Sequence, residues 1–477
     1  MSMKYQKIAW LVVLVLVFNH TVFSQNNTLT LQQCVEAAIA NNLDARQSEL
    51  LSESAAANLK QAKAGRLPTL SMDINHGANQ GRSIDPFTNS YIDQGVKFAN
   101  YGLNTSILLF SGNNITNTIK QNQYNYEATK MDFQQAKDDI TLNVILAYMQ
   151  VLSNEDQLVQ NNNQAELSQK QVERLDVLNS QGAIAPSQLF DLQGQLANDQ
   201  IAIINTQNAV DAAKLRLCQL MNVPFDPELK LDRLESQQEI KWYDANTKMI
   251  YESAAKQLGY VRATEYRKLS AEKALKASKG LLYPSIFLSG GLYTNYSSVA
   301  TTSLFVNSVD VPSGDYVSVA GNKVPVITTQ NNYQDQSIKY FDQFKNNYNT
   351  SVSLGVRIPI LNGWQTKTRI TQSKINLKNA DYVESTTKLQ LQQNIEQAHF
   401  NMTAAYKKLQ KLQEQQTAFA ESFRTAEVRF NAGSFNSIDY LVVKNSLDRT
   451  NVNLIVAKYE YILRTKVLDY YQGNPLW

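Results

Sequence analysis

The chain has 477 residues, with 45 Lys and Arg against 42 Asp and Glu, and only 18% of its residues are charged. This length allows more than one domain. The nearly balanced charge argues against a general nucleic-acid surface, so we expect no nucleic-acid partner.

The N-terminus has the order of a secretory signal peptide. Lys4 and Lys7 precede an apolar run from Ile8 to Phe18, and small residues up to Ser24 suit cleavage before position 25. The alternative is a membrane anchor, but the run is about half of the roughly 20 residues that a spanning helix needs. We therefore expect residues 1–24 to be a signal peptide and the mature chain to be exported. The cleavage site lacks the cysteine that would indicate a lipid anchor. No long apolar stretch follows it, so a membrane role would need β-strands.

The mature chain repeats itself. Residues 31–222 and 246–473 share the order helix, strand, loop, strand, long helix, long helix. Before the loops, matching residues lie 216 positions apart, as Pro68 and Pro284 do; after the loops, they lie 251 apart, as Gly182 and Gly433 do. We expect a first repeat over 25–222, a connector over 223–245, and a second repeat over 246–477 whose longer loop covers 297–349.

Four segments of about ten residues alternate between apolar and polar side chains, which is the pattern and length of a transmembrane β-strand. These segments are Thr69–His76, Tyr101–Leu109, Ser285–Tyr296 and Thr350–Ile360. A half-buried soluble sheet alternates in the same way, but the long polar segments 78–99 and 297–349, expected to be loops, favour an outer-membrane sheet. Four strands are too few to close a barrel, and open edges are not tolerated in a bilayer, so the chain must oligomerise.

Two long helical hairpins follow the strands. Residues 113–181 contain no proline or glycine, and 69 helical residues extend roughly 100 Å. Gly182 and Gly433 suit helix C-termini, and Pro186 suits the first turn of the next helix. Apolar residues recur every seven positions, which predicts helices packed side by side with a left-handed supercoil. The clearest series are Leu189, Leu196, Ile203, Val210 and Leu217, and Tyr440, Leu447, Leu454, Tyr461 and Leu468.

No catalytic constellation is present. Only His76 and His399 remain after cleavage, in different elements, and there is no phosphate loop, nucleophile elbow or zinc spacing. Cys34 and Cys218 lack metal-ligand spacing and lie on apolar helical faces, where buried thiols are ordinary; a disulfide between them is the alternative. We expect no enzyme activity, no catalytic or metal-binding residues and no cofactor.

The duplicated order of these elements resembles the TolC-like outer-membrane efflux proteins, over nearly the whole mature chain. The resemblance rests on the helix start around Glu36-Ala37-Ala38, on Leu67-Pro68 and Tyr283-Pro284 before strands, on Phe110-Ser111-Gly112 and Leu361-Asn362-Gly363 after strands, and on the tip glycines. It implies a mainly α fold with membrane β: a two-fold repeat with four transmembrane strands and two coiled-coil αα-hairpins per chain, forming a trimeric β-barrel and α-barrel.

The resemblance also implies a function. The chain would be a homotrimeric, passive exit duct in the outer membrane of a Gram-negative bacterium, in contact with outer-membrane lipid and extending into the periplasm. It would serve tripartite efflux or type I secretion through a periplasmic adaptor (membrane fusion) protein and an inner-membrane pump of the RND or ABC type. The alternative is a periplasmic coiled-coil structural or adhesive protein without a pore.

Two sets of site residues follow from the resemblance. The tips that contact the adaptor would be Gly182, Ala183 and Ile184, and Gly433, Ser434 and Phe435. Asp439 matches the first acidic position of the periplasmic gate, whereas Val442 stands where some members have a second acid, so this chain departs from the two-ring pattern there. Three Asp439 carboxylates around an axis would attract cations; the alternative is an ordinary first-turn acid that complements the helix dipole.

Overall fold

The computed structural model describes residues 28–84, 89–233, 241–244 and 246–476. The expected signal peptide, 1–24, lies outside the described residues. The chain divides into two compact units. The first, which we call the hairpin unit, comprises residues up to Ala55, Asn125–Lys268 and Asn379 onward; the second, the sheet unit, comprises Ala56–Tyr124 and Leu269–Lys378. Within the described ranges, no helix is both long and apolar enough to cross a membrane.

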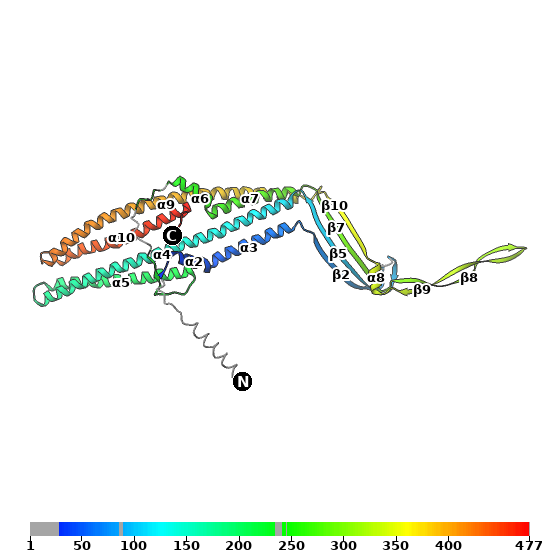
Figure 1. Cartoon of the computed structure of the whole chain (residues 1–477), viewed down its shortest axis with the longest axis horizontal. Helices are drawn as coiled ribbons and strands as arrows, with labels where there is room; N and C mark the ends of the chain where they lie inside the picture. Colours follow the sequence, from blue (N-terminus) through cyan, green and yellow to red (C-terminus); the bar gives the residue numbers. More distant parts are fainter. Residues whose placement is uncertain (1–27, 85–88, 234–240, 245, 477) are drawn as a thin grey trace, which may run out of the picture. The chain divides into compact units, whose positions relative to one another are not determined.

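The sheet unit contains four long antiparallel strands in the order β10-β7-β5-β2, which lie side by side in Figure 1. Their bounds are β2 Thr69–Asn79, β5 Val96–Ser111, β7 Ser285–Ser297 and β10 Asn349–Arg357. All four predicted strands are confirmed. β10 stops three residues short of the predicted end because Pro359, which has no backbone N–H to donate, follows closely.

The sheet has one apolar and one polar face. The register aligns Met72 with Leu103 and Leu103 with Leu292, so these side chains form one row across three strands. On β10, Val352 is 81% exposed and Leu354 66% exposed. The opposite face carries Asp73, Asn104 and Tyr293, joined by an Asn104 Nδ2 to Asp73 Oδ2 hydrogen bond of 2.8 Å and a Tyr293 hydroxyl donated to the Asn104 side chain. Because successive side chains of a strand point to opposite faces, the alternating sequence gives the sheet one apolar face and one polar face.

Both segments expected to be polar loops contain regular secondary structure. The segment 297–349 contains a long hairpin of β8 (Thr301–Val319) and β9 (Asn322–Ser337), then a short helix α8 (Tyr340–Asn346). The segment 78–99 includes the ends of β2 and β5 and a small pair, β3 (Arg82–Ile84) with β4 (Tyr91–Asp93). The segment 297–349 is rich in Val, Ser, Thr and Tyr with few apolar runs, and backbone pairing between strands does not require an apolar face.

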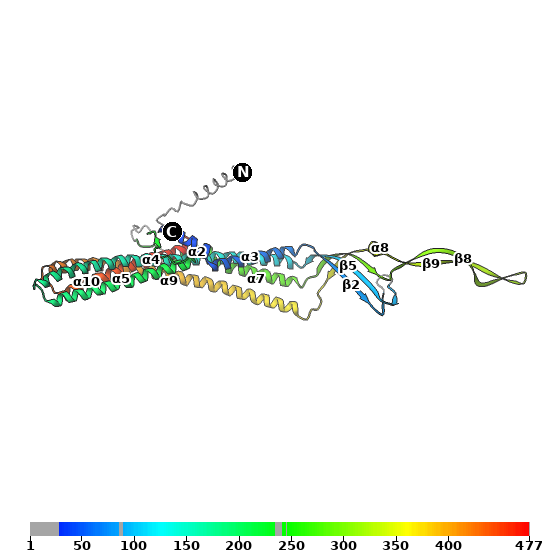
Figure 2. The same cartoon turned by 90° about the horizontal axis from the view of Figure 1, so that it is seen from below.

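The hairpin unit is built from helices that the duplication pairs one to one. Their bounds are α2 Leu31–Asn41, α3 Leu43–Ala64, α4 Asn114–Ser180 and α5 Pro186–Met221 in the first copy, and α6 Thr247–Gln257, α7 Gly259–Gly280, α9 Gln365–Asn431 and α10 Ser437–Gln472 in the second; α3, α4, α7 and α9 continue into the sheet unit. Figures 1 and 2 both show α5 folded back along α4 and α10 along α9. The two predicted αα-hairpins and the two-fold repeat are confirmed.

Two apolar clusters hold the first and second copies of the hairpin unit. In the second copy, the seven-residue series Ile395, Met402 and Leu409 is buried with Tyr461 and Leu468. In the first copy, α2 packs on α4 and α5, and a short parallel pair of β1 (Thr28–Leu29) and β6 (Lys230–Leu231) covers it. The buried Tyr148 hydroxyl donates to the Asp232 carbonyl at 2.5 Å.

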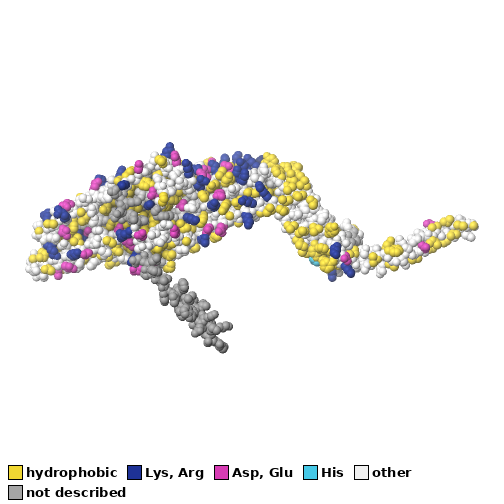
Figure 3. Space-filling model, viewed as in Figure 1, with side chains coloured by type: hydrophobic (Ala, Val, Ile, Leu, Met, Phe, Trp, Pro, Cys, Tyr) yellow, Lys and Arg dark blue, Asp and Glu magenta, His cyan; other side chains and the backbone are white. Residues whose placement is uncertain are grey.

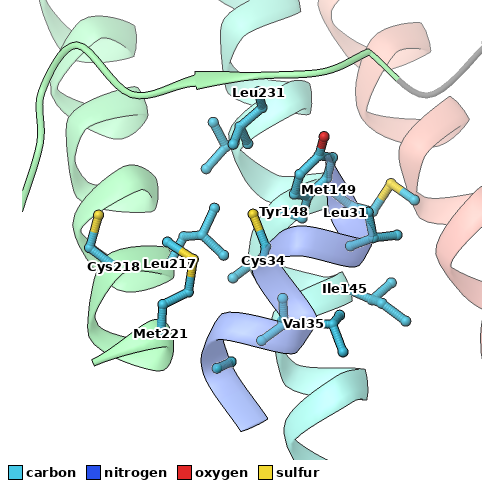
Figure 4. Close-up of a cluster of buried hydrophobic side chains, with 14 of the residues drawn as sticks. Leu31, Cys34, Val35, Ile145, Tyr148, Met149, Leu217, Cys218, Met221 and Leu231 are labelled. Carbon is cyan, nitrogen blue, oxygen red and sulfur yellow. The ribbon is translucent and has the colours of Figure 1, made fainter. Parts of the chain in front are cut away.

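Cys34 and Cys218 both lie in the apolar cluster of the first copy, as Figure 4 shows, and both are free thiols. Burial is the main cause that raises the pKa of the Cys34 thiol to about 11, and the neighbouring Cys218 is the second cause. These residues are therefore small apolar core residues here.

Candidate functional site

The tip of the first hairpin is a glycine-terminated turn. Gly182 adopts a left-handed φ of 71°, and the Gly182 and Ala183 amides donate to the Asn179 and Leu178 carbonyls, both at 2.9 Å. These bonds satisfy carbonyls that the end of α4 would leave unpaired. Ala185 then occupies the cap position of α5 without a side-chain hydrogen bond, and Pro186 begins the helix.

The second tip repeats this turn with a better cap. Gly433 has φ 72°, and the Ser434 amide donates to the Arg429 carbonyl at 2.9 Å. Asn436 caps α10: its Oδ1 accepts the Asp439 amide at 2.8 Å, and its Nδ2 donates to Asp439 Oδ2 at 2.7 Å. Asp439 is exposed in the single chain. The Asp439 carboxylate thus has a local capping partner and also faces solvent.

An aromatic cluster joins the two hairpins beside their tips. Tyr440 is 0% exposed, its ring stacks on Phe430 with centroids 4.4 Å apart, and Leu189 and Leu192 of the first hairpin complete the cluster. The Tyr440 hydroxyl has no hydrogen-bond partner among the described residues. Burial raises its pKa.

Polar contacts also cross between the hairpins near the tips. Arg174 on α4 donates to the Asn431 carbonyl at 2.5 Å, and the Ser437 hydroxyl on α10 donates to Asp191 Oδ2 on α5 at 2.7 Å. The tips of one chain are therefore fastened to each other by specific hydrogen bonds as well as by apolar packing.

A buried ionic group lies further along the same two helices. Lys444 of α10 is 1% exposed, and its Nζ lies 3.1 Å from Asp199 Oδ2 of α5 and 2.6 Å from Asp448 Oδ2. Asp199 also accepts hydrogen bonds from the Ser168 hydroxyl at 2.5 Å and the Gln195 amide at 2.7 Å. Burial raises the pKa of Asp448, and the nearby Lys444 only partly offsets that effect.

The structure places the predicted tip residues at the two turns as the sequence indicated. Sequence reasoning missed Lys444, Asp199 and Asp448, although a signal was available: Lys444 lies four positions after Tyr440 in the heptad series, on the side of α10 expected to be apolar. Within the described residues no three His, Cys, Asp or Glu side chains are grouped to hold a metal ion.

Comparisons with known proteins agree with this architecture. The model of the family described as outer membrane efflux protein matches residues 34–223 and 250–473. A comparison with curated proteins gave no match.

Several solved structures are similar to this chain. The outer membrane protein VceC of Vibrio cholerae is 13% identical, with a TM-score of 0.72, and the match covers 94% of this chain and 97% of VceC. The CmeC outer membrane channel of Campylobacter jejuni is 15% identical, with a TM-score of 0.73 over 93% of this chain and 85% of CmeC. The open state of the Neisseria gonorrhoeae MtrE outer membrane channel is 15% identical, with a TM-score of 0.72 over 94% of this chain and 89% of MtrE.

The matched family consists of channels rather than enzymes, and its members are trimers that work with adaptor and pump proteins. Both copies of the repeat lie within the matched residues. The chain therefore belongs to the outer membrane efflux protein family and is an outer-membrane exit duct of an efflux system that extends into the periplasm.

Proposed function

We propose that three copies of this chain join edge to edge into a passive duct, whose tips dock onto a periplasmic adaptor coupled to an inner-membrane pump of the RND or ABC type. The observation that carries the proposal is the four-stranded sheet. Its edge strands β2 and β10 each have one neighbour within the described residues of this sheet. Unpaired backbone groups are costly in lipid, so both edges need partners from other copies.

The two faces of the sheet support the same assembly. The row through Met72, Leu103 and Leu292 presents apolar side chains, which suit lipid, and the opposite face presents Asp73 and Asn104, which suit water. A soluble scaffold would bury the apolar face instead.

We propose the repeat boundaries 25–222 and 246–477 with the connector 223–245.

The tips are proposed as the adaptor contacts. A methyl group built on Gly182 or Gly433 would meet nothing within 4 Å, so each turn is surrounded by open space in the single chain. Ala183 and Ser434 are exposed and would be available to a partner, whereas Ile184 and Phe435 are half-buried against the aromatic cluster and would contribute only their exposed parts. Transport energy would come from the pump, and the duct itself would catalyse no reaction.

Asp439 is proposed as the gate residue. Three exposed carboxylates, one from each copy, would form an acidic ring that attracts cations at the periplasmic entrance. Its hydrogen bond with Asn436 would hold the carboxylate in a fixed position.

The first test is the mass of the detergent-extracted protein, corrected for bound detergent. A trimer that conducts ions in a planar bilayer supports the duct. A monomer or dimer that stays soluble without detergent would overturn the proposed trimeric assembly.

The site residues need separate tests. A photo-crosslinking residue at Ala183 or Ser434 should capture the adaptor, whereas the same probe at exposed Gln193 should not. Asp439→Ala should lower the cation selectivity of the channel and weaken its blockage by multivalent cations. Asp439→Glu should retain both properties. Unchanged selectivity in Asp439→Ala would leave that residue only its capping role.

A further inference from the structure

The helix ends that adjoin the four-stranded sheet carry a nearly uniform positive charge. Segments 56–68, 112–124, 269–284 and 358–378 contain eleven Lys and Arg and a single acid, Glu272, in a chain whose totals are 45 and 42. We call these residues the basic collar: Lys60, Lys63 and Arg66 of α3 and the turn after it, Lys120 of α4, Lys273, Lys276 and Lys279 of α7, and Lys367, Arg369, Lys374 and Lys378 of α9. Figure 3 shows Lys and Arg gathered where α7 and α9 approach the strands.

The collar charges are not neutralised within the chain. In the described ranges none of the eleven side chains forms an ion pair, and all except half-buried Lys273 are exposed. Arg66 donates to the Thr116 hydroxyl at 3.1 Å, and Lys367 lies 3.8 Å from the centre of the Trp364 ring. These two contacts orient the cations but leave their charge uncompensated.

Helix dipoles explain only a small part of the collar. Lys63 and Lys279 lie in the last turns of α3 and α7, where a positive charge is favourable. Lys367 and Arg369 lie in the first turns of α9, which contain no acid, and there a positive charge is unfavourable. An external negative surface would offset that local cost.

Apolar and aromatic anchors indicate where this surface lies. Between the strands and the collar, Ile360 and Leu361 are each 89% exposed and Trp364 is 66% exposed, and Leu67 and Tyr283 occupy the matching positions before β2 and β7. Exposed Trp and Tyr beside an apolar strand face are typical of a membrane–water interface. With Trp364 at such an interface, Lys367, which lies over its ring, would be at the depth of lipid headgroups.

We propose that the basic collar binds the phosphate groups of anionic phospholipids in the periplasmic leaflet of the outer membrane. This rests on the proposed function, because the strands must lie in that membrane with the helices on its periplasmic side. Attraction to an anionic surface fades within about 10 Å, and a helix rises 1.5 Å per residue. The near residues Lys63, Lys279, Lys367 and Arg369 should therefore contribute more than the far residues Lys60, Lys273, Lys374 and Lys378.

The test titrates the full-length channel, in neutral detergent micelles, with phosphatidylglycerol or phosphatidylcholine and counts retained lipids by native mass spectrometry. We expect the channel to prefer phosphatidylglycerol in a salt-sensitive manner. Each basic group near an anionic surface contributes about fivefold in affinity. Changing the four near residues to Gln should therefore weaken phosphatidylglycerol binding by more than about tenfold.

Three further variants serve as controls. Changing the four far residues to Gln should have a smaller effect. Gln at Lys248, Lys256, Lys407 and Arg449, four exposed cations of the hairpin unit, should leave lipid binding unchanged. Replacing the three near lysines by Arg should preserve binding because the charge is retained.

Each outcome has a distinct meaning. Equal binding of the two lipids by the wild type, or equal losses in the near-residue and hairpin-unit variants, would overturn the collar. A loss of anion preference in channel conductance without a change in lipid binding would also overturn it, and would place these residues along the conduit. Failure of the wild type to conduct in either lipid would instead count against the proposed duct.

Discussion

The two helical hairpins of this chain are copies in length but not in chemistry. α4 and α9 each have 67 residues, and α5 and α10 each have 36. The tip glycines adopt the same left-handed conformation, with φ of 71° and 72°. Duplication has therefore preserved the lengths of the helices and the geometry of the turns between them.

The differences gather in the residues just after each turn. Tyr440, Lys444 and Asp448 in the second hairpin match Leu189, Gln193 and Ala197 in the first. Lys444 is buried against Asp199, whereas Gln193 is exposed. The second hairpin thus contacts the first through a charged and aromatic group that the first hairpin does not reciprocate within the chain.

The strongest way to break this asymmetry is to remove the buried cation. Lys444→Met should destabilise the contact of α5 with α10 by about 3–5 kcal/mol, because buried Asp199 and half-buried Asp448 would be left without a counter-ion. Faster hydrogen exchange along both helices would report the loss. Gln193→Met at the exposed equivalent should change stability by less than about 0.5 kcal/mol. Adding Asp199→Asn and Asp448→Asn to Lys444→Met should restore much of the protection, and failure to do so would show that Lys444 acts through packing alone.

The tip glycines test what the hairpins share. Gly182→Ala and Gly433→Ala should each cost about 1–2 kcal/mol, because a side chain in the left-handed conformation is strained. Limited proteolysis at the tips would measure the effect. The two losses should be equal within error; a larger loss at Gly433 would mean that the second turn carries strain of its own.

The two hairpins differ at the residue that caps their second helix, so mutations can remove the cap of α10 or add one to α5. Asn436→Ala should cost about 1 kcal/mol by removing the α10 cap, and Ala185→Asn should stabilise α5 by a similar amount, since Ala185 already has extended backbone with φ −70° and ψ 134°. Hydrogen exchange at the first turn of each helix is the measurement. No gain in Ala185→Asn would indicate that Pro186 already fixes the start of α5.

The smallest expected effect is a dependence on pH. The pKa of Asp448 is raised in the folded chain, so the folded state binds its proton more tightly than the unfolded state. The contribution of Asp448 to the free energy of unfolding should therefore fall as pH rises through the window between its ordinary and raised values. Asp448→Asn should remove this component from a pH series of thermal unfolding, while the component from Asp138, whose pKa burial also raises, stays. A series unchanged by Asp448→Asn would contradict the assignment.

Sequence periodicity predicted the elements well because each obeys one local rule. Alternation gave the four strands, and the absence of glycine and proline across 113–181 gave α4 within a residue or two at each end. The β8–β9 hairpin escaped prediction because a segment exposed on both faces has no alternation to detect. The Lys444 group escaped because burial of a charge depends on a partner from the other copy, here Asp199, which is 245 residues away.

The order β10-β7-β5-β2, antiparallel throughout, has a consequence for how copies meet. β2 and β10 run in opposite directions, so the β10 edge of one copy can pair antiparallel with the β2 edge of the next, and strand direction allows a ring to close with two or more four-stranded copies. An open dimer joined this way still has two free edges, the same number as a single copy. Only the closing contact removes them. Assembly should therefore be cooperative, with incomplete rings scarce at equilibrium and the exported chain dependent on meeting all its partners before its edges pair elsewhere.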